Sequence, residues 1–157
     1  MRNYTDYRPN VAAIVLSSDY PNKCEFMISR RSGMKRGWQF PQGGIGKGEP
    51  LMKALLRELK EEIGTDDVEV LAEYPDWITY DFPKISKGKL YPYKGQTQKY
   101  FLVRLRDHKK IDLFAHEIPE FEEYKFVTQT ELFKKATFLK RKSYRRVINY
   151  FMKEGLL

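Results

Sequence analysis

Three glutamates lie within one short segment, RELKEEIG, which runs from Arg57 to Gly64. In a helix, residues three and four positions apart lie on the same side, so Glu58, Glu61 and Glu62 would lie close together. Like charges at this spacing destabilise a helix unless a cation is placed among them. The spacing leaves two interpretations open: a solvated acidic surface, or a site that binds a metal ion.

The segment from Pro50 to Gly64 is predicted to be helical, because proline favours the first helical position and glycine favours the end of a helix. Its apolar residues share one face, and the glutamates lie on another face together with Ala54. Arg57 is placed to pair with Glu61 one turn later and to reach back towards Glu49. The predicted apolar face consists of Met52, Leu55, Leu56, Leu59 and Ile63.

A glycine-rich loop, GWQFPQGGIGKGEP, leads into this helix. Glycines let backbone atoms approach a ligand closely, and a helix N-terminus favours anions. Mg²⁺ binds hard oxygen ligands, commonly carboxylates together with the phosphates of a substrate. Together, the loop and the acidic helix favour a phosphate ligand that is carried with a divalent metal ion.

The chain has 157 residues and a formal net charge of +8, with a sequence pI of about 9.4. This length predicts a single domain over residues 1–157 with a real hydrophobic core. The excess of basic over acidic residues favours polyanionic partners such as nucleic acid or nucleotides. The positive charge is concentrated in KKATFLKRKSYRRV, for which a solvated helix face is the simplest explanation.

Cellular location is predicted from two further features. No apolar run reaches the roughly 18 residues that a membrane span needs, and the first ten residues lack the apolar core of a signal peptide. The single Cys24 excludes an internal disulfide and is expected to be a small core residue beside Phe26. We therefore expect a cytoplasmic protein that does not act at a membrane.

The elements that must position the acidic helix can be predicted coarsely. Two further helices are expected over Gln129–Lys135 and Arg141–Lys153, and a long basic loop over PKISKGKLYPYKGQTQ. Strands that outnumber helices around one long helix predict an α/β sandwich around a mixed sheet. The expected strands are Val11–Leu16, Glu25–Arg30, Val68–Tyr74, Trp77–Phe82, Lys99–Arg106 and Tyr124–Val127.

From Gly43 to Gly64 the chain reads G-x5-E-x7-R-E-L-x-E-E-x-G, which resembles the Nudix box of the Nudix hydrolases. One position departs, because Thr65 stands where the family usually has an aliphatic residue, and this position packs rather than reacts. The resemblance implies a Nudix-type α/β/α sandwich. Further segments resemble the RNA pyrophosphohydrolase subgroup of this family, which overlaps the dinucleoside polyphosphate hydrolases. These segments are YRPNV, GWQFPQGGI, QKYFL, PEF and YRRV.

The resemblance implies hydrolysis of a nucleoside diphosphate linked to another group, with Mg²⁺ or Mn²⁺ as cofactor. Glu58, Glu61 and Glu62 would hold the metal ions, and one of them would orient or deprotonate the attacking water. The carbonyl of Gly43 would complete the metal shell, and Glu120 would be a further ligand or water-orienting group. In this family Arg57 and Glu49 would be structural and would pin the loop to the helix.

Substrate contacts are predicted for cationic and aromatic residues outside the box. Arg8, in YRPNV, resembles a residue of the RNA-acting subgroup, although each cation taken singly is also consistent with a surface charge. An exposed ring can stack on the 5′ base, since stacking tolerates any base, but for Trp38 and Phe138 a core position is equally consistent. The predicted phosphate contacts are Arg8, Arg31, Lys35 and Arg36, and the other predicted substrate contacts are Trp38, Tyr80, Phe138, Leu139 and Lys140.

The resemblance predicts an enzyme that removes pyrophosphate from the 5′-triphosphate end of RNA and leaves a 5′-monophosphate, which promotes mRNA decay. Asymmetric hydrolysis of diadenosine polyphosphates is the alternative activity. A non-catalytic module that only binds RNA or nucleotide is a third hypothesis, and it is disfavoured because no acidic residue of the box is lost. No obligatory protein partner is implied.

Overall fold

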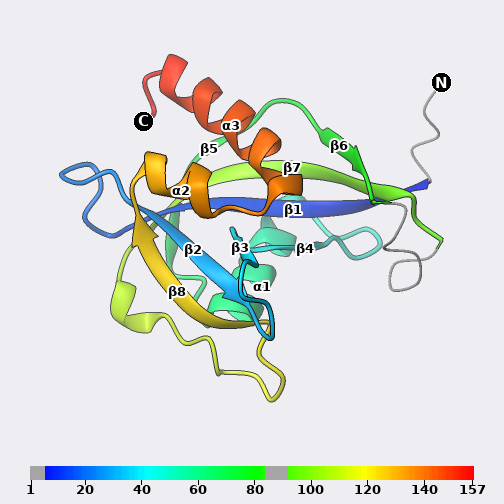
Figure 1. Cartoon of the computed structure of the whole chain (residues 1–157), viewed down its shortest axis with the longest axis horizontal. Helices are drawn as coiled ribbons and strands as arrows, with labels where there is room; N and C mark the ends of the chain where they lie inside the picture. The colour runs from blue at the N-terminus through cyan, green and yellow to red at the C-terminus, as the bar shows by residue number, and fades with distance from the viewer. Residues whose placement is uncertain (1–5, 84–91) are drawn as a thin grey trace.

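The computed structural model of the chain describes residues 6–83 and 92–157, which form an eight-stranded mixed sheet with helices on both faces (Figure 1). The strands are β1 (Tyr7–Leu16), β2 (Phe26–Arg31), β3 (Trp38–Gln39), β4 (Gln42–Gly44), β5 (Val68–Glu73), β6 (Ile78–Asp81), β7 (Gly95–Leu105) and β8 (Phe121–Val127). The helices are α1 (Leu51–Ile63), α2 (Gln129–Lys135) and α3 (Phe138–Lys153), and a short 3-10 helix covers His108–Lys110. No helix in these two ranges has both the length and the apolarity that a membrane span requires.

The strand order in the sheet is β3-β2-β1-β7-β5. Strands β1 and β7 run parallel, in a register that pairs Tyr7 with Gly95 and Leu16 with Arg104. The remaining pairs are antiparallel: β4 and β2 with β1, β3 and β8 with β2, and β5 and β6 with β7. The parallel register places residues 7–10 beside residues 95–98, so two segments far apart in the sequence lie side by side next to the short strand β4.

Both faces of β1 are buried, because its side chains alternate between two hydrophobic cores. Ala12, Ile14 and Leu16 belong to the core that includes the apolar face of α3. Val11, Ala13 and Val15 belong to the core that includes the apolar face of α1. The fold is therefore an α/β/α sandwich, as the sequence predicts.

All six predicted strands are present, with shifted ends. Strand β7 begins at Gly95, so GQTQ, predicted as the end of the basic loop, is strand instead. These four residues pair with β1 and β6, which a reading of local composition does not show. Residues 84–91 of the predicted loop lie outside the described residues. Strands β3 and β4 were not predicted, because segments of two and three residues are defined only by their pairing.

The predicted helices are confirmed with three corrections. Pro50 is the extended residue before α1 rather than its first helical residue, while Gly64 ends the helix in the left-handed conformation at φ 78° as predicted. Met52 is exposed and does not belong to the apolar face, because it lies on the side of α1 that faces away from the sheet. Helix α3 begins at Phe138, three residues before the predicted start.

Cys24 was predicted to be buried beside Phe26, and this prediction is wrong. The residue is exposed in the loop before β2, and only Phe26, the first residue of the strand, enters the core. Thr65, the position that departs from the box, is buried, and its hydroxyl accepts a hydrogen bond from the backbone N–H of Asp67 at 3.1 Å. It packs, as expected.

Candidate active site

Arg57 ties the glycine-rich loop to helix α1. Its Nε and Nη2 each donate to a carboxylate oxygen of Glu49 at 2.9 Å, and Nη2 also donates to the carbonyl of Gly44 at 2.8 Å. Its Nη1 donates to Glu58 at 2.8 Å and to Glu61 at 3.3 Å. This pairing holds the pKa of Glu49 near 2 and raises the pKa of Arg57. Both contacts predicted for Arg57, with Glu49 and with Glu61, are confirmed, and the contact with Glu49 holds the loop against the helix.

Gly43 lies directly against the carboxylate of Glu58. A Cβ at this position would stand 1.9 Å from the Glu58 carboxyl carbon, far inside van der Waals contact. Gly43 sits in β4, which pairs with β1 at Val11, so the strand cannot easily retreat from the helix. The absence of a side chain at Gly43 therefore leaves the space that the Glu58 carboxylate fills.

The three glutamates of α1 do not share one environment. The Glu61 side chain is 46% exposed and contacts Arg57, whereas Glu58 is mostly covered and Glu62 is buried. Glu62 accepts a hydrogen bond from the backbone N–H of Gln42 at 3.1 Å. Burial raises the pKa of Glu58, and it raises the pKa of Glu62 well above its usual range, an effect to which the charges of Glu58 and Glu120 add. Two of the carboxylates thus lie between the helix and the loop.

Lys140 faces this acidic region from the first turn of α3. Its side chain is buried, and its Nζ donates to Gln39 Oε1 at 3.2 Å. Burial lowers the pKa of Lys140 to about 7, and the nearby charge of Glu62 opposes this shift. Lys140 lies in the basic segment 134–146, and the expectation that it belongs to a basic surface is wrong, because on α3 it points to the opposite side, towards Glu62. Its predicted contact with substrate stays a prediction.

Arg8 lies beside the same loop. Its guanidinium packs against Gly44, where a Cβ would stand 2.4 Å from Nη2. Its positive charge also lowers the pKa of Glu58 and of Tyr80, although burial outweighs this effect and raises both, so the guanidinium lies near the acidic helix and near that ring. Among the described residues, Asp6 forms its ion pair with Lys94 and not with Arg8. Arg8 is therefore not neutralised by the acid nearest to it in the sequence.

Comparison with known proteins decides the family. Residues 6–148 match the family described as NUDIX domain. The chain belongs to the Nudix family. Over all 157 residues, covering the whole of both chains, it is 61% identical to a protein of a Sulfurovum species named RNA pyrophosphohydrolase, and 55% identical to one of the same name from Campylobacter jejuni. Among solved structures, the Escherichia coli dihydroneopterin triphosphate pyrophosphohydrolase shares the fold, with a TM-score of 0.71 at 18% identity over 91% of this chain and 98% of the other.

Nudix hydrolases generally use divalent metal ions, and the donor set in this Nudix domain suits one. Glu58 and Glu62 place carboxylates in a partly buried region where burial disfavours ionisation of both, the charge of Glu61 further disfavours it at Glu58, and the charges of Glu58 and Glu120 further disfavour it at Glu62. A cation would remove this cost. The other two acids are paired with arginines: Glu61 with Arg57, which also contacts Glu58, and Glu120 with Arg31 at 3.5 Å. Accordingly, within residues 6–83 and 92–157, no three acidic, histidine or cysteine side chains already surround a single point.

The remaining residues predicted to contact substrate fall into three groups. Trp38 is 7% exposed and belongs to the core, and Arg30, Lys125 and Lys135 lie over its ring, so it is not available to stack on a base. Arg31 is exposed and pairs with Glu120. Lys35 and Arg36 lie apart from the acidic helix, in a hollow bounded by the start of α3, and Phe138 and Leu139 are exposed nearby.

A chain of buried amides beneath the Nudix loop was not predicted. Gln98 Nε2 donates to Gln42 Oε1 and to Asn10 Oδ1, each at 2.9 Å, and Asn10 Nδ2 donates to Gln96 Oε1 at 2.9 Å. Gln96 Nε2 then donates to the hydroxyl of Tyr80 at 2.8 Å. The alternating polar residues of GQTQ were the available signal. This series of hydrogen bonds links β4, the strand that carries Gly43, to Tyr80. It therefore sets the spacing between the acidic side chains of α1 and the Tyr80 ring.

The buried Lys140 predicts a pH dependence of stability. Its pKa is lowered on folding, so the unfolded chain binds more protons between about pH 7 and the usual lysine value, and stability rises with pH across that window. We expect the stability of the wild type, relative to Lys140→Met, to increase from pH 7 to pH 9.5 by up to ~1.4 kcal/mol per pH unit. Chemical denaturation of both metal-free proteins measures this, and parallel pH curves would contradict it.

Proposed function

We propose that this Nudix domain is an RNA pyrophosphohydrolase that releases pyrophosphate from the 5′-triphosphate end of RNA and leaves a 5′-monophosphate. The observation that carries the proposal is the 61% identity, over the full length of both chains, to a relative of that name. The position of Arg8 beside Glu58 supports it, because a guanidinium there suits a polyphosphate that must approach the acidic helix. Removal of pyrophosphate in this way, in the cytoplasm, promotes mRNA decay.

The chemistry is divided among a few side chains. We propose Mg²⁺ or Mn²⁺, held by Glu58, Glu61, Glu62 and Glu120 with the carbonyl of Gly43. When bound, the metal neutralises phosphate charge and lowers the pKa of water. Arg57 keeps the loop and Glu58 in place. The attacking water loses its proton to one of the carboxylates, its oxygen bonds to phosphorus, and the anhydride bond to the departing pyrophosphate breaks.

The test is a comparison of two substrates with Mg²⁺ present. We expect 5′-triphosphorylated RNA to be hydrolysed faster than diadenosine tetraphosphate at matched low concentrations, with pyrophosphate and 5′-monophosphorylated RNA as products. A preference for the dinucleotide would instead support the alternative, asymmetric hydrolysis of diadenosine polyphosphates. If neither substrate is hydrolysed, the non-catalytic hypothesis would replace both.

Arg8 provides a test at the level of one residue. Arg8→Ala is expected to lower kcat/KM on triphosphorylated RNA by roughly one to two orders of magnitude, which corresponds to a lost charge-assisted contact of ~1.5–3 kcal/mol. Arg8→Lys should recover only part of the loss, because an ammonium cannot reproduce the planar contact of a guanidinium. Lys94→Ala, which removes an exposed cation paired with Asp6, is the matched control. Wild-type rates in both Arg8 variants would show that Arg8 does not contact substrate.

A further inference from the structure

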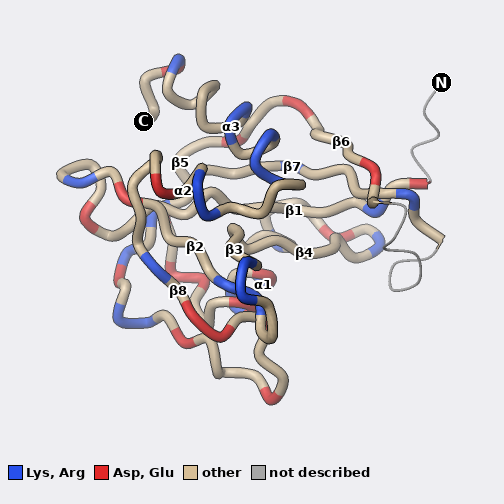
Figure 2. Tube along the Cα trace, in the orientation of Figure 1, with Lys and Arg blue, Asp and Glu red and all other residues tan. Residues whose placement is uncertain are grey.

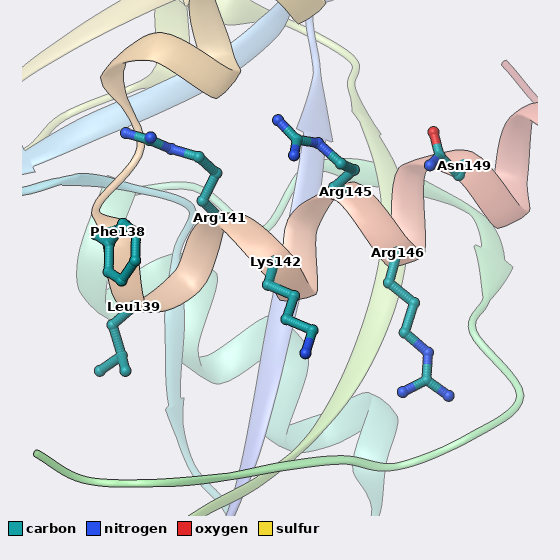
Figure 3. Close-up of a pocket in the computed structure, with 7 residues that line it drawn as sticks. All are labelled: Phe138, Leu139, Arg141, Lys142, Arg145, Arg146 and Asn149. Carbon is teal, nitrogen blue, oxygen red and sulfur yellow. The ribbon is translucent and has the colours of Figure 1, made fainter.

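A basic surface begins where α3 begins and continues along its outer side. Two adjoining hollows share Phe138 and Arg141. The first lies between the β2–β3 loop, the end of α2 and the start of α3, and the second follows α3 to Asn149, with side chains that fan outward from the helix (Figure 3). We call their cationic residues the α3 track: Lys35, Arg36, Lys134, Lys135, Arg141, Lys142, Arg145 and Arg146.

The charge of the α3 track is not neutralised within the protein. Elsewhere, cations such as Arg30, Arg57 and Arg104 pair with carboxylates, but within residues 6–83 and 92–157 no member of the track forms an ion pair. Where its members have partners, the partners are uncharged: Arg145 lies over the ring of Phe133, and Arg146 donates to the hydroxyl of Tyr74. Among the residues that the structure describes, none that lines either hollow is acidic, and Figure 2 shows the basic residues along α3. Such a surface is suited to a polyanion.

Aromatic and hydrogen-bonding groups accompany this charge. The ring of Phe138, at the junction of the two hollows, is 88% exposed, which is unusual for phenylalanine and leaves its face free for stacking. Two polar atoms at the same junction, Thr137 Oγ1 and Arg141 Nε, are covered and lack a hydrogen-bond partner within the described residues. Cations that follow a path beside an exposed ring are typical of surfaces that bind single-stranded nucleic acid.

The α3 track and the acidic site lie on opposite sides of the first turn of α3. Lys140 points inward from the first turn of α3 towards Glu62, while its neighbours Phe138 and Arg141 line the hollows. An RNA whose reacting end lies at Glu62 would therefore pass around the first turn of α3 before it follows the helix. From Lys142 to Asn149 the helix extends by about 10 Å, enough to follow more than one nucleotide.

We propose that the α3 track binds the single-stranded sugar-phosphate chain of the RNA substrate beyond its first nucleotides, with Phe138 stacking on a base. This inference rests on the proposed function and adds to it how a long substrate is held. The α3 track would also make the enzyme distinguish RNA from dinucleotides, because the phosphates of a dinucleotide end near the active site and do not reach the track. An acidic protein segment is the other polyanion to consider, but it supplies no bases for the exposed ring.

Binding tests the track without catalysis. Fluorescence anisotropy with a 5′-monophosphorylated 12-nucleotide RNA, in EDTA, is compared for the wild type and Lys142→Ala/Arg145→Ala; both replaced residues are exposed. We expect affinity to fall roughly tenfold and the slope of log K against log salt to become shallower by about 1.4, since each lost phosphate contact contributes about 0.7. Lys23→Ala/Lys109→Ala removes the same charge from exposed positions elsewhere and should keep the wild-type slope. Equal effects of the two double variants would overturn the proposal, because only net charge would then matter.

Hydrolysis of two RNA lengths separates this inference from the proposed function. With triphosphorylated RNAs of 2 and 12 nucleotides, the wild type should have the higher kcat/KM on the longer RNA, and this ratio should fall towards one in Lys142→Ala/Arg145→Ala and in Phe138→Ala. The wild type could release pyrophosphate from both RNAs while the ratio of kcat/KM on the longer RNA to that on the shorter one is the same in every variant. This result would contradict RNA binding by the α3 track and leave the proposed function intact. If the wild type cleaves neither RNA, the proposed function fails, and the anisotropy experiment alone decides the track. An acidic peptide that displaces the RNA more strongly than an equal concentration of unlabelled RNA would assign the surface to a protein partner instead.

Discussion

Glu62→Gln is expected to lower the rate of pyrophosphate release at least about 100-fold while the protein keeps its fold. Glu62 is buried against the Nudix loop, and its carboxylate is one of the few that can meet both a metal ion and the attacking water there. Loss of a metal ligand or of a group that moves a proton typically costs two or more orders of magnitude. Glutamine has the same shape, so the hydrogen bond from the Gln42 N–H is retained.

Thermal unfolding without metal distinguishes this effect from damage to the fold. Burial and the charges of Glu58 and Glu120 already oppose ionisation of Glu62, so its replacement should leave metal-free stability unchanged or slightly higher. Stabilisation by added Mg²⁺ should be smaller than in the wild type, because a ligand that binds the native state stabilises it. Glu123→Gln is the control, since Glu123 pairs with Arg30 on the surface. Wild-type turnover in Glu62→Gln would remove Glu62 from the catalytic group.

Gly43→Ala is expected to abolish most activity through a single methyl group. The added Cβ would stand within about 2 Å of the Glu58 carboxylate, which must then move. Because the colliding atoms are the far end of a flexible side chain, the cost to stability should be small. The displaced Glu58 would lose its contact with Arg57 and its place in the proposed metal site. We expect at least a 50-fold lower rate, since small misplacements at a reacting centre carry costs of this size.

Gly46→Ala is the matched control in the same loop. A Cβ there would come no closer than 3.4 Å to Glu49, which is near ordinary van der Waals contact. It should retain most of the activity, which would show that the effect at Gly43 is specific to Glu58. Similar rates for Gly43→Ala and the wild type would mean that Glu58 can act from another position, and a large loss of stability in Gly43→Ala would mean that β4 rather than Glu58 yields.

What the sequence determined by itself was chiefly local. The spacing of Glu49, Arg57 and Glu61 predicted an ion-pair network that is present, because residues on one helix and the loop entering it are held at fixed distances by the helix itself. The end of α1 at Gly64 was also predicted, because glycine ends helices through its own backbone conformation. The limits of α2 at Gln129 and Lys135 agree with the prediction as well. The G-x5-E-x7-R-E-L-x-E-E-x-G pattern indicated the family and hence the sandwich.

The tertiary structure alone decided the environment of each charged group. Glu62 is buried while Glu61, one residue away, is exposed, because burial depends on which side of α1 docks beside β4. Lys140 was predicted with the surface cations, but it points inward because α3 begins earlier and packs its first turn over Gln39. The amide chain from Gln42 to Tyr80 exists only because parallel pairing brings residues 7–10 beside residues 95–98. Contacts between residues so far apart in the chain are set by the packing of the whole sheet, which no local pattern contains.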